Sequence, residues 1–156
     1  MAGPRRRARE IALQILHQGE AGSDPSLDPD TAIARYFAHL AQRDDDDNDG
    51  DESAPLVPKA DRELVERLVR GVAAHRAEID QLFANLSRNW RVERIAIVER
   101  NVIRIALFEL RWSDGTPVNV ILNEAIELAK RYGTSEGAAF VNGLLDRAVD
   151  ELNVRG

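Results

Sequence analysis

The stretch IAIVERNVIRIALFEL, residues 95–110, decides the class of fold. Apolar residues lie on almost every side of a helix drawn through it, which is typical of a helix that packs against neighbours on several sides. We therefore predict a central, buried helix here. Arg104 and Glu109 fall within it, and because an unpaired charge is expensive to bury, we expect each to have a partner or to reach the surface.

The sequence on both sides of this stretch predicts further helices and no strand. Apolar residues recur at spacings of three and four over residues 4–19, 28–40, 60–86, 117–132 and 134–152. Capping residues support the boundaries, since Asp28, Thr116 and Thr134 are suited to N-caps and Gly133 to a helix end. Together these segments indicate an all-α protein.

A single long helix is predicted over residues 60–86, with Gly71 inside it. A glycine in mid-helix costs about 1 kcal/mol relative to alanine, so it needs a reason. Either the helix bends there or another helix approaches its backbone closely, and we favour the close approach. Trp90 and Trp112 flank the central helix, where we expect them to anchor its two ends.

The composition bounds the class of protein. The chain has 156 residues, 44% of them hydrophobic, which is enough for one core and fits a single domain over residues 1–156. It has no cysteine, which excludes disulfides, thiolate metal sites and cysteine nucleophiles. No segment approaches the roughly 18 consecutive apolar residues of a membrane span, so we expect no membrane association. These features fit a cytoplasmic protein.

The negative charge of the chain is concentrated in one segment. The run DDDDNDGDE, residues 44–52, holds seven acids and no base, and without those seven acids the net charge of −6 would become +1. This run lies within residues 43–58, which also contain glycine, serine and two prolines. Because such a composition buries too little apolar surface to become ordered, we predict an acidic, disordered loop there.

In contrast to the acidic run, the N-terminus of the chain is basic. Arg5, Arg6, Arg7 and Arg9 stand against one acid, Glu10. Such a run is often only a solvated terminus. Here, however, four cations at the start of a helix oppose its dipole, at a cost of up to about 0.3–1 kcal/mol each when exposed. RNA phosphates would reverse that effect, so we hypothesise that these four arginines hold RNA phosphates.

Nothing in the sequence indicates an enzyme. His17, His39 and His75 fall on three different predicted helices without the spacing of metal ligands, and we expect His17 to be partly buried. No glycine-rich phosphate loop and no nucleophile motif occurs. We therefore predict no catalytic residues, no metal and no cofactor.

Four motifs make the chain similar to a known family. They are RRRARE at 5–10, RIALFEL at 104–110 followed by Pro117, NEAIELAK at 123–130 and FVNGLLD at 140–146. In this order they resemble the NusB family of transcription antitermination factors, over all of the chain except about residues 21–58. The resemblance implies a bundle of about seven helices in two sub-bundles, without enzymatic activity. It also implies binding to the single-stranded boxA element of nascent RNA together with the ribosomal protein NusE, within the RNA polymerase antitermination complex.

The resemblance also implies which residues take part. At the start of the last helix it points to Glu136, Gly137, Phe140 and Asn142 as RNA-binding residues. Core packing is an equal alternative for Phe140. For Asn142 and Gly143 a structural role is the favoured alternative, in which the glycine lets two helices approach. For contact with NusE, we expect Glu99 and Arg100 on the exposed side of the central helices.

Two other functions are compatible with a helical chain of this kind. One is a protein-binding helical adaptor or a homodimer in which the RNA surface is covered. The other is a part of an RNA cytosine methyltransferase, since these enzymes carry a similar helical domain. We discount the second alternative because the sequence holds no cofactor-binding βαβ region.

Overall fold

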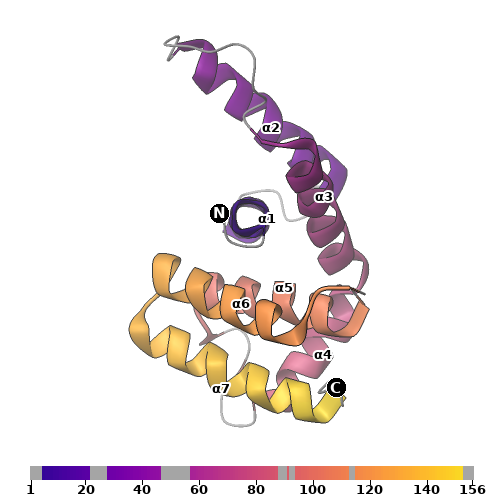
Figure 1. The fold of residues 1–156 in the computed structure, drawn as a ribbon, viewed down its shortest axis with the longest axis vertical. Coiled ribbons are helices and arrows are strands. Elements are labelled where there is room, and N and C mark those ends of the chain that lie inside the picture. Colours follow the sequence, from indigo (N-terminus) through magenta and orange to yellow (C-terminus); the bar gives the residue numbers. More distant parts are fainter. Residues whose placement is uncertain are drawn as a thin grey trace. The chain divides into compact units, whose positions relative to one another are not determined.

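The computed structural model describes residues 5–21, 28–46, 57–87, 91, 94–112 and 115–152, and these form seven α-helices and no strand (Figure 1). This confirms the predicted all-α class. In chain order the helices are α1 (Arg6–Ala21), α2 (Pro29–Asp46), α3 (Lys59–Ala74), α4 (Arg76–Leu86), α5 (Ile97–Trp112), α6 (Val118–Tyr132) and α7 (Ser135–Leu152). No helix of the described residues is long and apolar enough to cross a membrane.

The contacts within the chain divide it into two compact units, residues 1–70 and residues 71–156. The boundary between them falls inside α3. In the first unit, α1 packs against α2, and the Tyr36 hydroxyl donates a hydrogen bond of 2.9 Å to Gln14 Oε1. The guanidinium of Arg62 lies 4.4 Å from the centre of the Phe37 ring, which links α3 to α2.

The second unit is built around α5, as the sequence predicts. Residues 101–110 are all buried, and α5 packs against α4, α6 and α7. Figure 1 shows α5, α6 and α7 lying side by side in this unit. A helix surrounded in this way has no solvent-facing stripe, which explains why its sequence is apolar on almost every side.

The buried charge of Arg104 has partners, as expected. Its Nε donates to Asp80 Oδ1 at 2.8 Å, one terminal nitrogen donates to Asp80 Oδ2 at 3.2 Å, and the other donates to Asn101 Oδ1 at 3.1 Å. Burial by itself would raise the pKa of Asp80, but hydrogen bonds and attraction from Arg104 and Arg76 outweigh it and lower the pKa. The pair therefore joins α4 to α5 in its ionised form at neutral pH.

The prediction of one helix over residues 60–86 is wrong, because the helix is interrupted at His75 and a second helix begins after it. This residue is the N-cap of α4, with φ −107° and ψ 18°, and its ring stacks on Trp112 at 4.2 Å between centroids. The favoured interpretation of Gly71 is confirmed, since a Cβ there would collide with the ring of Phe108. Trp112 ends α5 against His75, in keeping with an anchor, whereas Trp90 lies outside the described residues.

Most predicted helix boundaries agree with the structure. Asp28 caps α2 by accepting a hydrogen bond of 3.3 Å from the Thr31 N–H, and the Thr134 hydroxyl accepts one of 2.9 Å from the Gly137 N–H at the start of α7. Gly133 is the C-cap of α6.

Two predicted boundaries are wrong. The N-cap of α6 is Pro117 rather than Thr116, because the helix begins one residue later and has no side-chain cap. The acidic loop does not begin at residue 43, since α2 continues to Asp46; lengthening an existing helix adds hydrogen bonds without a new nucleation cost. Residues 47–56 of the predicted loop lie outside the described residues.

Candidate nucleic-acid interface

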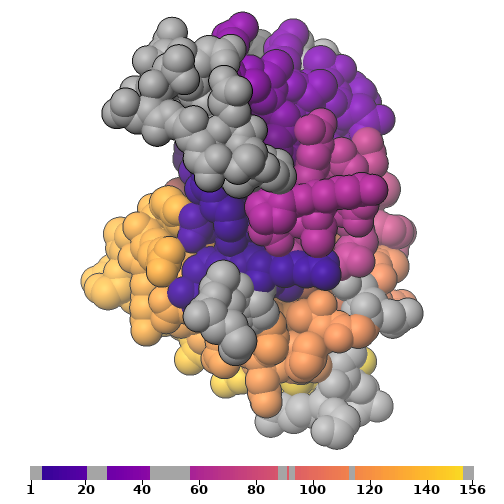
Figure 2. Space-filling model, turned by 45° about the horizontal axis from the view of Figure 1, so that its top comes forward, coloured from indigo at the N-terminus to yellow at the C-terminus, as the bar shows by residue number. Residues whose placement is uncertain are grey.

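The first candidate surface is the arginine arm, which we define as Arg5, Arg6, Arg7 and Arg9 at the start of α1. Arg5 and Arg7 are exposed and Arg6 is half-buried, whereas Arg9 is only 3% exposed. The hypothesis that all four hold RNA phosphates requires exposed guanidinium groups, and Arg9 does not meet this requirement. It lies one turn from buried Leu13 on the same face of the helix. Figure 2 shows part of α1, in indigo, at the molecular surface.

The arm is a cationic helix end. No acidic residue lies in the first turn of α1, so nothing there complements the positive end of its dipole. Arg7 approaches Glu10 at 3.9 Å, but with 51% of the arginine side chain exposed such a pair contributes little. Arg5 has a φ of 53°, so the chain enters the helix through a residue in the left-handed region. This end of α1 is suited to an anionic ligand.

The second candidate surface is a hollow at the start of α7, with a volume of about 530 Å³. It brings together three of the four residues predicted there, Glu136, Gly137 and Phe140. Asn142 is exposed but does not line this α7 hollow. The sequence interpretation missed Tyr132, which lines the hollow with 42% of its surface exposed. Its position continues the apolar stripe of α6, so periodicity alone would place it in the core.

The structure distinguishes the alternatives for Phe140 and Gly143. Phe140 is half-buried and lines the hollow, so its ring is not simply part of the core. The close-packing role suggested for Gly143 is wrong, because Gly143 is exposed and an added Cβ would have nothing within 4 Å. Both Phe140 and Asn142 are therefore available to a ligand.

Glu99 holds the start of α7 in place. Its side chain is only 5% exposed, and its Oε1 accepts a hydrogen bond of 3.2 Å from the Thr134 N–H. A Cβ at Gly133 or Gly137 would collide with this carboxylate, so both glycines make room for it. The expectation that Glu99 lies on an exposed side is therefore wrong. Arg100, its neighbour, is half-buried.

This arrangement determines what the hollow can bind. The Glu99 carboxylate lies at the positive end of the α7 dipole, where an anion is stabilised, so a phosphate would meet a position already taken by a negative charge. Two aromatic rings, from Tyr132 and Phe140, line the same hollow. Arg94 also lines the hollow, so its lining holds charges of both signs beside the two rings. The hollow is consequently suited to a planar group such as a nucleobase, whereas the arm is suited to phosphates.

The described residues offer little for catalysis or metal binding. Among them, no group of three or more His, Asp or Glu side chains is arranged to hold a metal ion. His17 is half-buried, as expected, His39 is exposed and His75 stacks on Trp112.

The fold and the two surfaces define a small helical protein that has a cationic helix end in its first unit and an aromatic hollow in its second, features expected of an RNA-binding adaptor. Comparison with known proteins agrees with this class. The model of the NusB family matches residues 6–150. The transcription antitermination protein NusB of Myxococcus xanthus is 44% identical over 151 residues, which cover 97% of this chain and 98% of that protein.

Solved structures give the same result. The T. maritima NusB structure is 34% identical, covers 97% of this chain and 94% of its own, and superposes with a TM-score of 0.69. A structure of the antitermination factors NusB and NusE in complex with double-stranded RNA has the same fold, with 22% identity, a TM-score of 0.72 and coverage of 97% of this chain and 99% of that one. The chain belongs to the NusB family.

Proposed function

We propose that this protein is an RNA-binding transcription antitermination factor, which binds boxA-type single-stranded RNA of nascent transcripts together with the ribosomal protein NusE. It acts within the RNA polymerase antitermination complex, in the cytoplasm, as an adaptor without catalytic activity. The observation that carries the proposal is the arginine arm, a cationic helix end with no acid in its first turn. Membership of the NusB family supports it.

The arm provides affinity in this proposal. Arg5, Arg6 and Arg7 reach solvent at a helix end that already favours anions, so their guanidinium groups and the N–H groups of the first turn act on the same phosphates. Arg9 has a structural role in this proposal, because its side chain is buried. We assign it to holding α1 in place behind the exposed arginines.

The α7 hollow provides base contacts. Tyr132 and Phe140 offer ring faces for stacking, and stacking of a base on an aromatic ring contributes about 1–3 kcal/mol. The Glu136 carboxylate, which is exposed in the same hollow, accepts hydrogen bonds and favours a base that carries an amino group. Asn142, further along the exposed side of α7, is a second candidate for reading a base edge.

The proposed role of NusE is based on a solved structure with the same fold. The structure with the same fold that contains NusB, NusE and RNA shows that this fold is compatible with such an assembly. Since Glu99 is buried, Arg100 remains the candidate for a polar contact with NusE.

The experiment is a fluorescence anisotropy titration of labelled boxA-like RNA against a scrambled RNA, with and without NusE. The wild-type chain is expected to prefer the boxA-like sequence and to bind it more tightly when NusE is present. The double variant Arg5→Ala/Arg7→Ala should bind every RNA more weakly, because it loses phosphate contacts. Arg67→Ala/Arg147→Ala is the matched control, since it removes two exposed arginines of α3 and α7 and changes the net charge equally.

Equal binding of boxA-like and scrambled RNA, with or without NusE, would overturn the proposal. If the protein binds no RNA and sedimentation shows a dimer, the alternative of a homodimer with a covered RNA surface gains support instead. A loss of affinity as large in the control variant as in the arm variant would show that net charge alone matters.

A further inference from the structure

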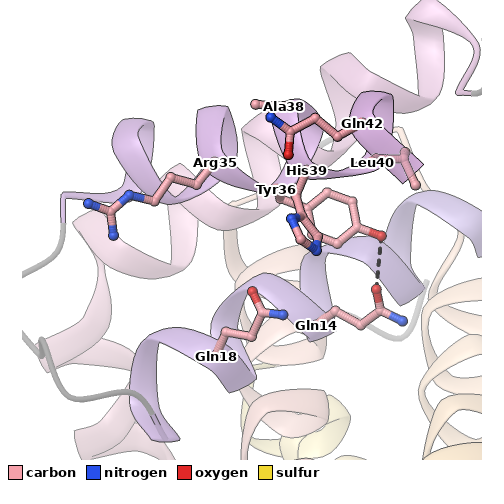
Figure 3. A pocket seen from close by; sticks show the side chains of 8 residues that line it. All are labelled: Gln14, Gln18, Arg35, Tyr36, Ala38, His39, Leu40 and Gln42. Carbon is pink, nitrogen blue, oxygen red and sulfur yellow. Dashed lines mark hydrogen bonds between the residues drawn. The ribbon is translucent and has the colours of Figure 1, made fainter. Parts of the chain in front are cut away.

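A second hollow lies between α1 and α2 in the first unit of the chain, with a volume of about 670 Å³ (Figure 3). We call it the α1–α2 groove. Figure 3 shows Gln14 and Gln18 on α1 below Tyr36 and His39, which point down from α2 toward them. Arg35 and Gln42, also from α2, complete the polar lining. None of these residues takes part in the function proposed above.

The chemistry of the groove is that of a base-reading site. Three of its side chains are primary amides, and each amide both donates and accepts hydrogen bonds, as base edges do. Among the described residues that line the groove there is no acid, and Arg35 adds a positive charge, which favours a nucleic acid. A volume of about 670 Å³ lies within the range of about 300–1,000 Å³ that small-molecule sites occupy.

One of these amides is already oriented. The Tyr36 hydroxyl donates to Gln14 Oε1 at 2.9 Å, which holds the amide in the position that Figure 3 shows. A side chain fixed in this way loses less freedom when a ligand binds than an exposed glutamine does. Gln18 and His39 are exposed, so they are reachable from solvent.

The groove and the arginine arm lie along the same face of α1. Arg7 and Gln14 are seven residues apart, close to two helical turns, so they share a face of α1, and Gln18 lies one further turn along that face. At about 1.5 Å per residue, Gln14 and Gln18 are about 10 Å and 16 Å beyond Arg7 along the helix axis. An RNA strand held at Arg7 therefore needs only a few more nucleotides to reach the groove.

From this alignment we propose that the α1–α2 groove is a nucleobase subsite, which takes an unstacked base of the same RNA strand whose phosphates the arginine arm holds. Gln14 and Gln18 read the edge of the base, and the rings of Tyr36 and His39 pack against it. This inference rests on the proposed function, since it needs RNA at the arm. It adds a contact with sequence preference to a surface that otherwise binds only the RNA backbone.

The test is a double-mutant cycle between the protein and the RNA. Binding of boxA-like RNA is measured by anisotropy for the wild type and for Gln14→Ala/Gln18→Ala, using the intact RNA and a series in which one base at a time is replaced by an abasic site. The variant is expected to bind intact RNA at least about fivefold more weakly, as for the loss of one bidentate base contact. At one abasic position the two proteins should bind equally, because the lost contact is absent from both.

Three controls separate this result from other causes. Gln81→Ala removes an exposed glutamine of α4 that does not line the groove, and it should leave the affinity unchanged. The salt dependence of binding should be the same in wild type and groove variant, since a glutamine neutralises no phosphate. Gln18→Ala alone, at an exposed position that tolerates truncation, should show a smaller loss that disappears at the same abasic position.

The outcomes distinguish the inference from the proposed function. If the wild type binds RNA and the arm variant does not, while the groove variants bind like wild type at every position, the groove subsite is wrong and the RNA-binding function stands. If the groove variants lose affinity by the same factor for every abasic RNA, the groove acts on the fold or on another ligand, and the subsite is again wrong. If the wild type binds no RNA, both fail together.

Discussion

Replacing Gly137 by alanine should destabilise the protein, although alanine is the better helix former. An added Cβ at this position would lie 2.6 Å from Cδ and 2.7 Å from Cγ of Glu99, which is too close for non-bonded carbon atoms. The Glu99 side chain is buried and bonded to the Thr134 N–H, so it cannot simply turn away into solvent. Either α7 shifts or this hydrogen bond breaks.

The size of the effect follows from these contacts. A hydrogen bond to a charged group contributes about 1.5–3 kcal/mol, and forcing an extra carbon into a packed site costs about 1–3 kcal/mol. Against this, replacing glycine by alanine in a helix gains at most about 1 kcal/mol. The two costs overlap, because breaking the bond relieves the crowding. We therefore expect a net loss of about 2 kcal/mol in the free energy of unfolding.

The assay is urea unfolding followed by circular dichroism, with Gly143→Ala as the matched control. Gly143 lies on the same helix, but its added Cβ would meet nothing within 4 Å. The same substitution there should raise the stability by up to about 1 kcal/mol. The two substitutions should therefore change the free energy of unfolding in opposite directions. The reasoning about the Glu99 contact is refuted if Gly137→Ala is as stable as Gly143→Ala.

Three further predictions concern the second unit. Asp80→Asn should destabilise the protein by about 2 kcal/mol at pH 7, between the values for a buried and a surface ion pair, because it weakens the partner of buried Arg104. Since the pKa of Asp80 is lowered by folding, the difference from wild type should persist above the ordinary value of 3.8 and shrink below it, which urea unfolding at several pH values measures. Arg76→Gln, which removes the more exposed partner, should cost less than 1 kcal/mol, as a surface pair of ~0–1 kcal/mol does. Gly71→Ala should lower the melting temperature, because its Cβ collides with Phe108; an unchanged melting temperature would contradict the close approach.

The central helix could be predicted from the sequence because a helix that is buried on all sides has apolar residues on almost every side. The break at His75 could not. The apolar stripe continues across it, from Val72 to Ile79, and the break depends on the stacking of His75 on Trp112, a residue 37 positions away in the chain. Periodicity detects which side of a segment is buried, but it does not detect where two helices with the same stripe meet.

The candidate site was predictable in part. The exposure of Arg5 and Arg7 follows from their place in a charged run, but the same run gave no warning for Arg9. The helical period does contain a signal, since Arg9 is four residues before buried Leu13. For Glu99 the helical period gives no signal of burial.

An acid in the first turn of a helix is ordinarily exposed, and only the tertiary structure places it beside Gly133 and Gly137. Those two glycines, four residues apart where α6 meets α7, are the feature by which the sequence indicates the buried carboxylate.

The most direct test of RNA binding by the arginine arm is the salt dependence of RNA affinity. For single-stranded RNA the logarithm of affinity falls with the logarithm of salt concentration by about 0.7 for each neutralised phosphate. If Arg5 and Arg7 each hold one phosphate, Arg5→Ala/Arg7→Ala should flatten that slope by about 1.4, twice the value for one phosphate. Arg67→Ala/Arg147→Ala, with the same net charge, should keep the wild-type slope. An arm variant whose slope equals that of the wild type would contradict the account.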